Sequence, residues 1–98
     1  MDVVAILKSA LEAPVIPERP QGCGRIYVAV PDKDAAKKVS AAAKKLGMDF
    51  QPRSYYGTRN ALYIGYDNAD GRTLARGTAV VAALKAVGIS CHRDEHGD

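Results

Sequence analysis

The sequence predicts a small α+β domain: two helices cover one face of a four-stranded antiparallel sheet, and a further helix precedes them. Three observations support this prediction. The 98 residues suit a single core. Nearly half of them, 47%, are apolar. Segments with the two-residue period of strands also alternate with segments that have the 3.6-residue period of helices. With no Trp and one Phe, the core must consist mainly of Val, Ile, Leu and Ala.

The first predicted element is a helix from about Val3 to Glu12, capped by Asp2 and carrying a broad apolar surface. Pro14 ends it. The stretch PVIPERPQGCG, residues 14–24, has three prolines and two glycines, so we expect an extended linker there. The N-terminal helix, 1–13, is thereby separated from the domain predicted over 25–93.

A strand and a helix follow the linker. The segment RIYVAV, 25–30, alternates with period two, and Pro31 ends it. Asp32 or Asp34 caps the next helix, whose apolar stripe lies opposite two pairs of lysines. Gly47 stands where a helix-terminating glycine is expected.

Two strands, a helix and a last strand complete the pattern. MDFQPRSY, 48–55, is a strand that Pro52 confines to a sheet edge. Gly57 marks a hairpin, and NALYIGY, 60–66, is the third strand. Asp70 can cap a helix over about 72–87, which Gly88 ends. ISCHR, 89–93, is a short fourth strand, and we expect 94–98 to be a flexible acidic tail.

After the N-terminal helix, the predicted order is β-α-β-β-α-β, which resembles the split βαβ arrangement of ferredoxin-like domains. The resemblance implies the strand order 4-1-3-2, with strands one and three at the centre. Pro52 on strand two is consistent with an edge position.

Because helices cover one sheet face, the two-residue period decides which side chains lie on the other, here called the open face. If Ile26 and Leu62 face the helices, their neighbours face outward. Gly65 is expected outward by the same alternation, and no acid from the strand cores is expected there. The candidate binding residues on the open face are Arg25, Tyr27, Arg53, Tyr55, Arg59, Tyr63 and His92.

The hairpin register affects this set. A three-residue loop over 56–58 keeps Phe50 in the core, and we favour it. A two-residue turn at Gly57 and Thr58 would instead place Tyr56 outward in place of Tyr55.

The central strands resemble the RNA-recognition motif. IYVAV is similar to its strand-one signature, with Tyr27 at the stacking position. RNALYIGY, 59–66, resembles the strand-three signature at Arg59, Tyr63, Ile64 and Tyr66, although Asn60, Ala61 and Leu62 replace a glycine, an aromatic and a small residue. The resemblance implies that bases stack on Tyr27 and Tyr63 while arginines hold phosphates.

The leading hypothesis is a non-enzymatic module that acts by protein–protein interaction or self-association through the open face, since Tyr and Arg are enriched at protein interfaces. The first alternative is binding of single-stranded RNA or DNA on the same face. Another is a small-ligand regulatory domain, because the topology resembles that of ACT-type modules. The N-terminal helix could also fold back and cover the open face.

Charge favours an anionic partner. The net charge is +3, and residues 19–93 contain 13 Lys and Arg against five acids. The pairs Lys37-Lys38 and Lys44-Lys45 are expected on the solvent side of their helix.

No catalytic residue, cofactor or metal site is predicted. Cys91, His92, Asp94 and His96 lie close together in sequence but lack the paired spacing of zinc ligands, and a disulfide between Cys23 and Cys91 is conceivable. The turn VPDKDA holds two aspartates where acylphosphatases, which share this topology, would hold an anion. With no secretory signal and no long apolar run, we expect a cytoplasmic location and no membrane contact.

Overall fold

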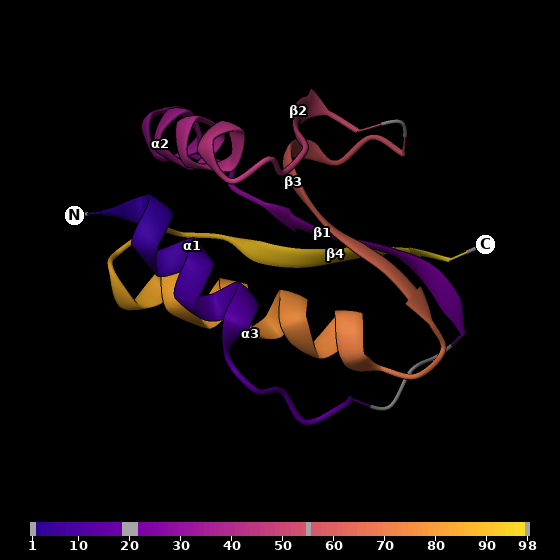
Figure 1. Cartoon of the computed structure of the whole chain (residues 1–98). Coiled ribbons are helices and arrows are strands. Elements are labelled where there is room, and N and C mark those ends of the chain that lie inside the picture. Colours follow the sequence, from indigo (N-terminus) through magenta and orange to yellow (C-terminus); the bar gives the residue numbers. More distant parts are fainter. Residues whose placement is uncertain (1, 19–21, 55, 98) are drawn as a thin grey trace.

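A computed structural model describes residues 2–18, 22–54 and 56–97 (Figure 1). Three helices and a four-stranded antiparallel sheet within these residues confirm the predicted α+β class. The elements in chain order are α1 (Val3–Glu12), β1 (Cys23–Ala29), α2 (Lys33–Lys45), β2 (Phe50–Arg53), β3 (Arg59–Asn68), α3 (Arg72–Ala86) and β4 (His92–Gly97).

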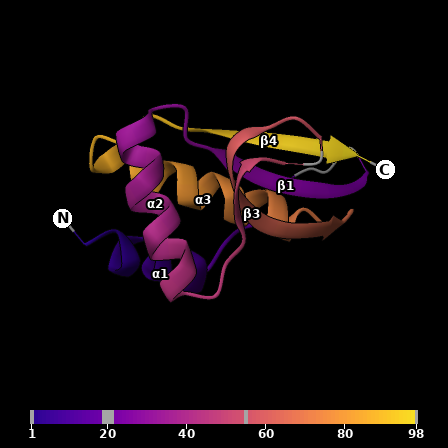
Figure 2. The ribbon, with the colours of Figure 1, turned by 90° about the horizontal axis from the view of Figure 1, so that it is seen from above.

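The sheet has the order β2-β3-β1-β4, and each neighbouring pair is antiparallel. Read from the other edge it runs β4-β1-β3-β2, and Figure 2 shows β1 between β3 and β4. Strand β2 lies at an edge of the sheet and has a neighbouring strand on one side. An edge strand tolerates the missing N–H of Pro52, as expected.

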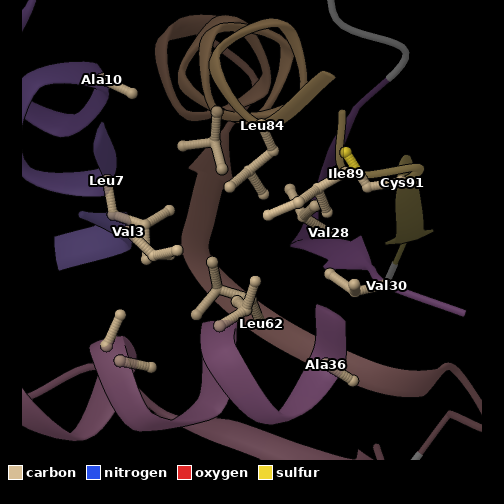
Figure 3. Packing of buried hydrophobic residues seen from close by; sticks show 14 residues of the cluster. Val3, Leu7, Ala10, Val28, Val30, Ala36, Leu62, Leu84, Ile89 and Cys91 are labelled. Carbon is tan, nitrogen blue, oxygen red and sulfur yellow. The ribbon is translucent and has the colours of Figure 1, made fainter. Parts of the chain in front are cut away.

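All three helices pack on the same side of the sheet. Helix α1 contacts both α2 and α3, which in turn contact the strands. Figure 3 shows Leu7 of α1, Leu62 of β3 and Leu84 of α3 in one apolar cluster with Val28 of β1, and each is fully buried. The alternative in which α1 covers the open face is therefore wrong, because the apolar surface of α1 is already used in the core.

The described part of the linker packs along α3. The Glu18 N–H donates to the Gly71 carbonyl at 3.0 Å. A Cβ on Gly71, whose φ is +79°, would lie 1.7 Å from the Glu18 carbonyl oxygen, so only glycine fits. The Glu18 carboxylate also accepts from Thr78 and pairs with Arg93 at 2.8 Å. These hydrogen bonds, that of Thr78 first, hold the pKa of Glu18 below its usual value.

Arg76 of α3 caps the C-terminal end of α1. Its Nη1 donates to the Ala10 carbonyl at 2.7 Å and to the Ala13 carbonyl. A cation at this end also complements the helix dipole. Helix α1 is thus joined to α3 by polar as well as apolar contacts.

A β-bulge in β3 changes which residues face outward. Tyr63 lies opposite Tyr27 but Gly65 lies opposite Ile26, so Ile64 is the additional residue. Gly65 consequently faces α3, where a Cβ would lie 3.1 Å from Thr73 Cγ2. The expectation that Gly65 faces outward is wrong, because strict alternation takes no account of a bulge.

Strand β4 extends through the acidic segment. It pairs with β1 from His92, opposite Ala29, to Gly97, opposite Gly24. The expected strand at 89–93 is therefore wrong over 89–91, which precede β4, and the expected flexible tail is wrong over 94–97, which belong to β4. The segment has low intrinsic strand propensity, and β1 supplies the hydrogen-bonding partner that local sequence cannot indicate.

The hairpin register keeps the predicted faces but not the predicted loop. Phe50 lies opposite Leu62 and packs against the core, as expected. Arg53 lies opposite Arg59, so the connection between β2 and β3 is two residues longer than predicted. The shift is an even number of residues, which leaves the paired residues of β2 on their expected faces. Tyr55 lies outside the described residues.

Candidate binding face

The open face brings together most of the predicted binding residues. Side chains directly opposite each other in an antiparallel pair share a face. By these pairings, the open face carries Arg25, Tyr27, Arg53, Arg59, Tyr63 and His92. Tyr27 and Tyr63 are neighbours, with ring centroids 5.3 Å apart and planes inclined by 52°.

Tyr27 is nevertheless only 6% exposed. On its β4 side the His96 ring lies 5.8 Å away in an edge-on arrangement. Burial, followed by the proximity of Tyr63, raises the pKa of the Tyr27 phenol. The predicted stacking pair thus exists, but one of its two rings is covered.

The connection between β2 and β3 reaches across the open face to β4. The Tyr56 ring stacks on His96 with centroids 5.0 Å apart and planes at 17°. The buried Thr58 hydroxyl donates to Asp94. These contacts place the connection beside Tyr27. The segment between β2 and β3 therefore covers part of the open face, as had been expected of the N-terminal helix as one alternative.

Thr58, Asp94 and His96 form a hydrogen-bonded group, here called the Thr58 cluster. Nε2 of His96 lies 2.8 Å from Thr58 Oγ1 and 3.2 Å from Asp94 Oδ2. Because the single hydroxyl proton goes to Asp94, Nε2 carries the proton that these two contacts require. A nucleophile triad instead needs the acid and the hydroxyl on different ring nitrogens. The cluster therefore holds the connection between β2 and β3 against β4. Asp94 also corrects the expectation that the open face carries no acid.

Arg25 lies between two tyrosines. Its Nη1 donates to the Tyr56 hydroxyl at 2.7 Å, and its guanidinium lies 5.3 Å from the Tyr56 ring centroid and 6.0 Å from that of Tyr66. Both distances suit cation–π contacts. Tyr56 is still 40% exposed. Tyr66 reaches this face only because of the bulge, which left no signal in the strand alternation.

The cationic side chains gather in a hollow of about 800 Å³ at the other end of the open face, here called the basic groove. Its lining includes Ala29, Lys33, Arg53, Arg59, His92 and Asp94. Lys33 was not predicted: it belongs to the first turn of α2, which brings it beside the end of β1. Three of the four basic residues were predicted from strand alternation.

Arg53 and Arg59 lie directly opposite each other in the groove, and both are exposed. Among the described residues neither forms an ion pair with a carboxylate. The one carboxylate that lines the groove, Asp94, is hydrogen-bonded to Thr58 and His96. Like charges opposite each other on a sheet are destabilising, so the free protein does not gain from this arrangement.

The cysteines are separate free thiols. Cys23 is exposed, whereas Cys91 is buried, and burial raises the pKa of the Cys91 thiol. Within the described part of the chain, no three His, Cys, Asp or Glu side chains are arranged to hold a metal ion. None of the described helices is long and apolar enough to cross a membrane.

No protein-family model matches the chain, and the searches of curated proteins and of solved structures gave no significant match. What the molecule binds is therefore inferred from its own residues.

Proposed function

We propose that the protein is a non-enzymatic binding module that holds an acidic segment of a partner protein in the basic groove. The observation that carries this proposal is the opposed pair Arg53 and Arg59, exposed and without a carboxylate partner among the described residues. An anion between the two guanidinium groups would turn a repulsive pair into charge-assisted hydrogen bonds.

The fold supports a rigid platform for such a groove. From β1 onward the element order is β-α-β-β-α-β, and we infer a ferredoxin-like arrangement to which α1 is an addition. The groove draws its basic residues from β2, β3, α2 and β4, which this arrangement brings to one place.

Charge favours a different protein over a second copy. A symmetric pairing of two copies through this face would set equivalent patches against each other. The open face of each copy carries Arg25, Arg53 and Arg59, with Asp94 as the acid among its described strand residues, so two such faces would repel each other.

Single-stranded nucleic acid is the second candidate. The same cations and the partly exposed Tyr63 favour it. The covered ring of Tyr27 favours the protein partner instead, because stacking needs an accessible ring face.

The test is a titration of the whole protein at low salt with a labelled Glu-rich peptide and, separately, with a single-stranded oligonucleotide of equal length. We expect saturable binding of the peptide that weakens with salt. Replacing both arginines by alanine should weaken it by about tenfold or more, because hydrogen bonds to charged groups contribute about 1.5–3 kcal/mol each. The matched control is Lys38→Ala with Lys45→Ala, which removes the same charge from exposed positions on α2.

The same double variants also separate binding from folding. In the free protein, loss of Arg53 and Arg59 should leave the unfolding free energy unchanged or raise it by a few tenths of a kcal/mol, since a repulsion is removed. Equal losses of affinity in both double variants would mean that net charge alone explains the loss, and would refute the proposal that the basic groove is the binding site. Tighter binding of the oligonucleotide than of the peptide would favour the nucleic-acid candidate.

A further inference from the structure

The opposed arginines and the groove around them also indicate which acidic group is bound. We infer that Arg53 and Arg59 form a subsite for a phosphate monoester, carried by a phosphorylated side chain of the partner segment. This inference rests on the proposed function and deepens it.

The first argument is the number of hydrogen-bond donors. Each guanidinium presents a planar fork that matches two oxygens. A carboxylate has two oxygens, and once both are engaged by one fork the opposite arginine can only share oxygens that already accept hydrogen bonds. A phosphate monoester has three free oxygens and can accept from both forks at once. The cross-strand placement of Arg53 and Arg59 therefore suits phosphate better than carboxylate.

The second argument is charge. A phosphate monoester carries about 1.5 to 2 negative charges at neutral pH. The two guanidinium groups balance this charge, and Lys33 lies on the wall of the same groove. His92, the first residue of β4, also lines the groove; it is exposed and pairs with Ala29 of β1. A single carboxylate would leave at least one of the two guanidinium charges uncompensated.

The third argument is the fixed position of the strand that carries Arg59. The neighbouring Asn60 has a φ of +49°, in the left-handed region that few residues other than glycine and asparagine adopt. Its carbonyl accepts the Val30 N–H at 3.1 Å, which ties this point of β3 to the end of β1. On the other side, the Ser54 N–H donates to the Thr58 carbonyl at 2.8 Å and closes the hairpin. The two arginines therefore project from backbone that is held on both sides.

Asp94 is the one negative group that lines the groove. Its carboxylate accepts from Thr58 and contacts His96. It is thus held by the Thr58 cluster and does not pair with either arginine.

The experiment compares two peptides on the full chain. Both have the same acidic sequence, with phosphoserine at the central position in one and Glu in the other. We expect the phosphopeptide to bind about tenfold more tightly. A double variant, Arg53→Lys with Arg59→Lys, keeps the charge but removes the forks, and it should reduce this preference to less than about twofold. Its affinity for the Glu peptide should change less.

A second measurement uses inorganic phosphate as the probe. It should shift the backbone amide resonances of Arg53, Arg59 and His92, and it should compete with the phosphopeptide. Unfolding curves of the lysine variant show whether its fold is intact, and Lys38→Ala with Lys45→Ala again provides the control.

Equal affinity for the two peptides would overturn the phosphate inference while leaving the acidic-partner proposal in place. Absence of binding for both peptides would remove the proposed function and this inference with it. An oligonucleotide that binds more tightly than the phosphopeptide would also overturn the inference, because it would assign the arginines to a nucleic-acid backbone.

Discussion

At the scale of single residues, Asp67 shows how one carboxylate joins two elements. It lies near the end of β3, is 2% exposed, and accepts from the Gly71 N–H at 3.1 Å and the Leu74 N–H at 2.9 Å. The predicted cap, Asp70, does accept from the Arg72 N–H at 3.0 Å, but it is exposed. Asp67 therefore satisfies the buried N–H groups at the start of α3.

The pKa of Asp67 reflects two opposing effects. Burial alone would raise it, but hydrogen bonds from the backbone N–H groups of residues 69, 70, 71 and 74 outweigh burial and lower it from 3.8. Because the folded pKa is lowered, the stabilisation from the ionised form is present above the unfolded pKa. It is lost as the pH falls through the folded value.

Asp67→Asn should therefore lower the unfolding free energy at neutral pH by about 1–3 kcal/mol, since a charged acceptor of buried N–H groups is lost. The difference from the unchanged protein should shrink in acid, where the native carboxyl also becomes neutral. Urea unfolding at a series of pH values measures it. Asp34→Asn, which removes an exposed carboxylate from the first turn of α2, should cost at most about 1 kcal/mol. A pH-independent difference for Asp67→Asn would contradict this account.

At the scale of elements, the connection between β2 and β3 decides how the open face is used. Thr58 and Tyr56 attach it to β4, and Tyr27 lies beneath with a raised pKa. This connection contributes to two parts of the open face, because Thr58 lines the basic groove while Tyr56 contacts Arg25.

Thr58→Val removes the hydroxyl that links this connection to Asp94 and should cost about 1–3 kcal/mol, because Asp94 loses a partner. The pKa of Tyr27 should fall toward its usual value of 10.0 as the ring becomes accessible. Alkaline titration of phenolate absorbance measures this pKa. The Tyr27→Phe variant shows which part of the titration of the five tyrosines belongs to Tyr27. An unchanged titration in Thr58→Val would mean that the Thr58 cluster does not keep Tyr27 covered.

At the scale of the whole molecule, the apolar surfaces are directed inward. Helix α1 packs against α2 and α3, Arg76 holds its C-terminal end, and the described linker residues pack on α3. What remains on the open face is mainly charged or aromatic, which suits a partner of opposite charge.

The free protein should therefore sediment as a monomer at high micromolar concentration, and Tyr63→Glu should leave its sedimentation unchanged. Repulsion between two open faces that both carry an excess of cations is the physical reason. Sedimentation velocity at low and moderate salt measures it. A two-chain species that Tyr63→Glu dissociates would restore self-association as the function of the open face.

Much of the fold could be predicted from local patterns. Helix α1 has the predicted bounds, and Asp2 accepts from the Ala5 N–H as expected of its cap. Asp32 likewise caps α2. The edge position of β2 followed from Pro52, because a missing N–H is a local fact with a consequence for the sheet. Alternation placed Tyr27, Tyr63, Arg53 and Arg59 on one face, since parity survives a register shift of two residues.

By itself, the sequence thus determined most of the elements, the faces of their residues outside the bulge and the excess of basic residues, because period, capping and proline chemistry act over a few neighbouring residues. Only the tertiary structure decided the bulge at Ile64, the strand status of 94–97 and the covering of Tyr27. It also set Arg53 against Arg59 and brought Lys33 beside them. Each of these features depends on a partner far away in the chain, which local sequence does not encode.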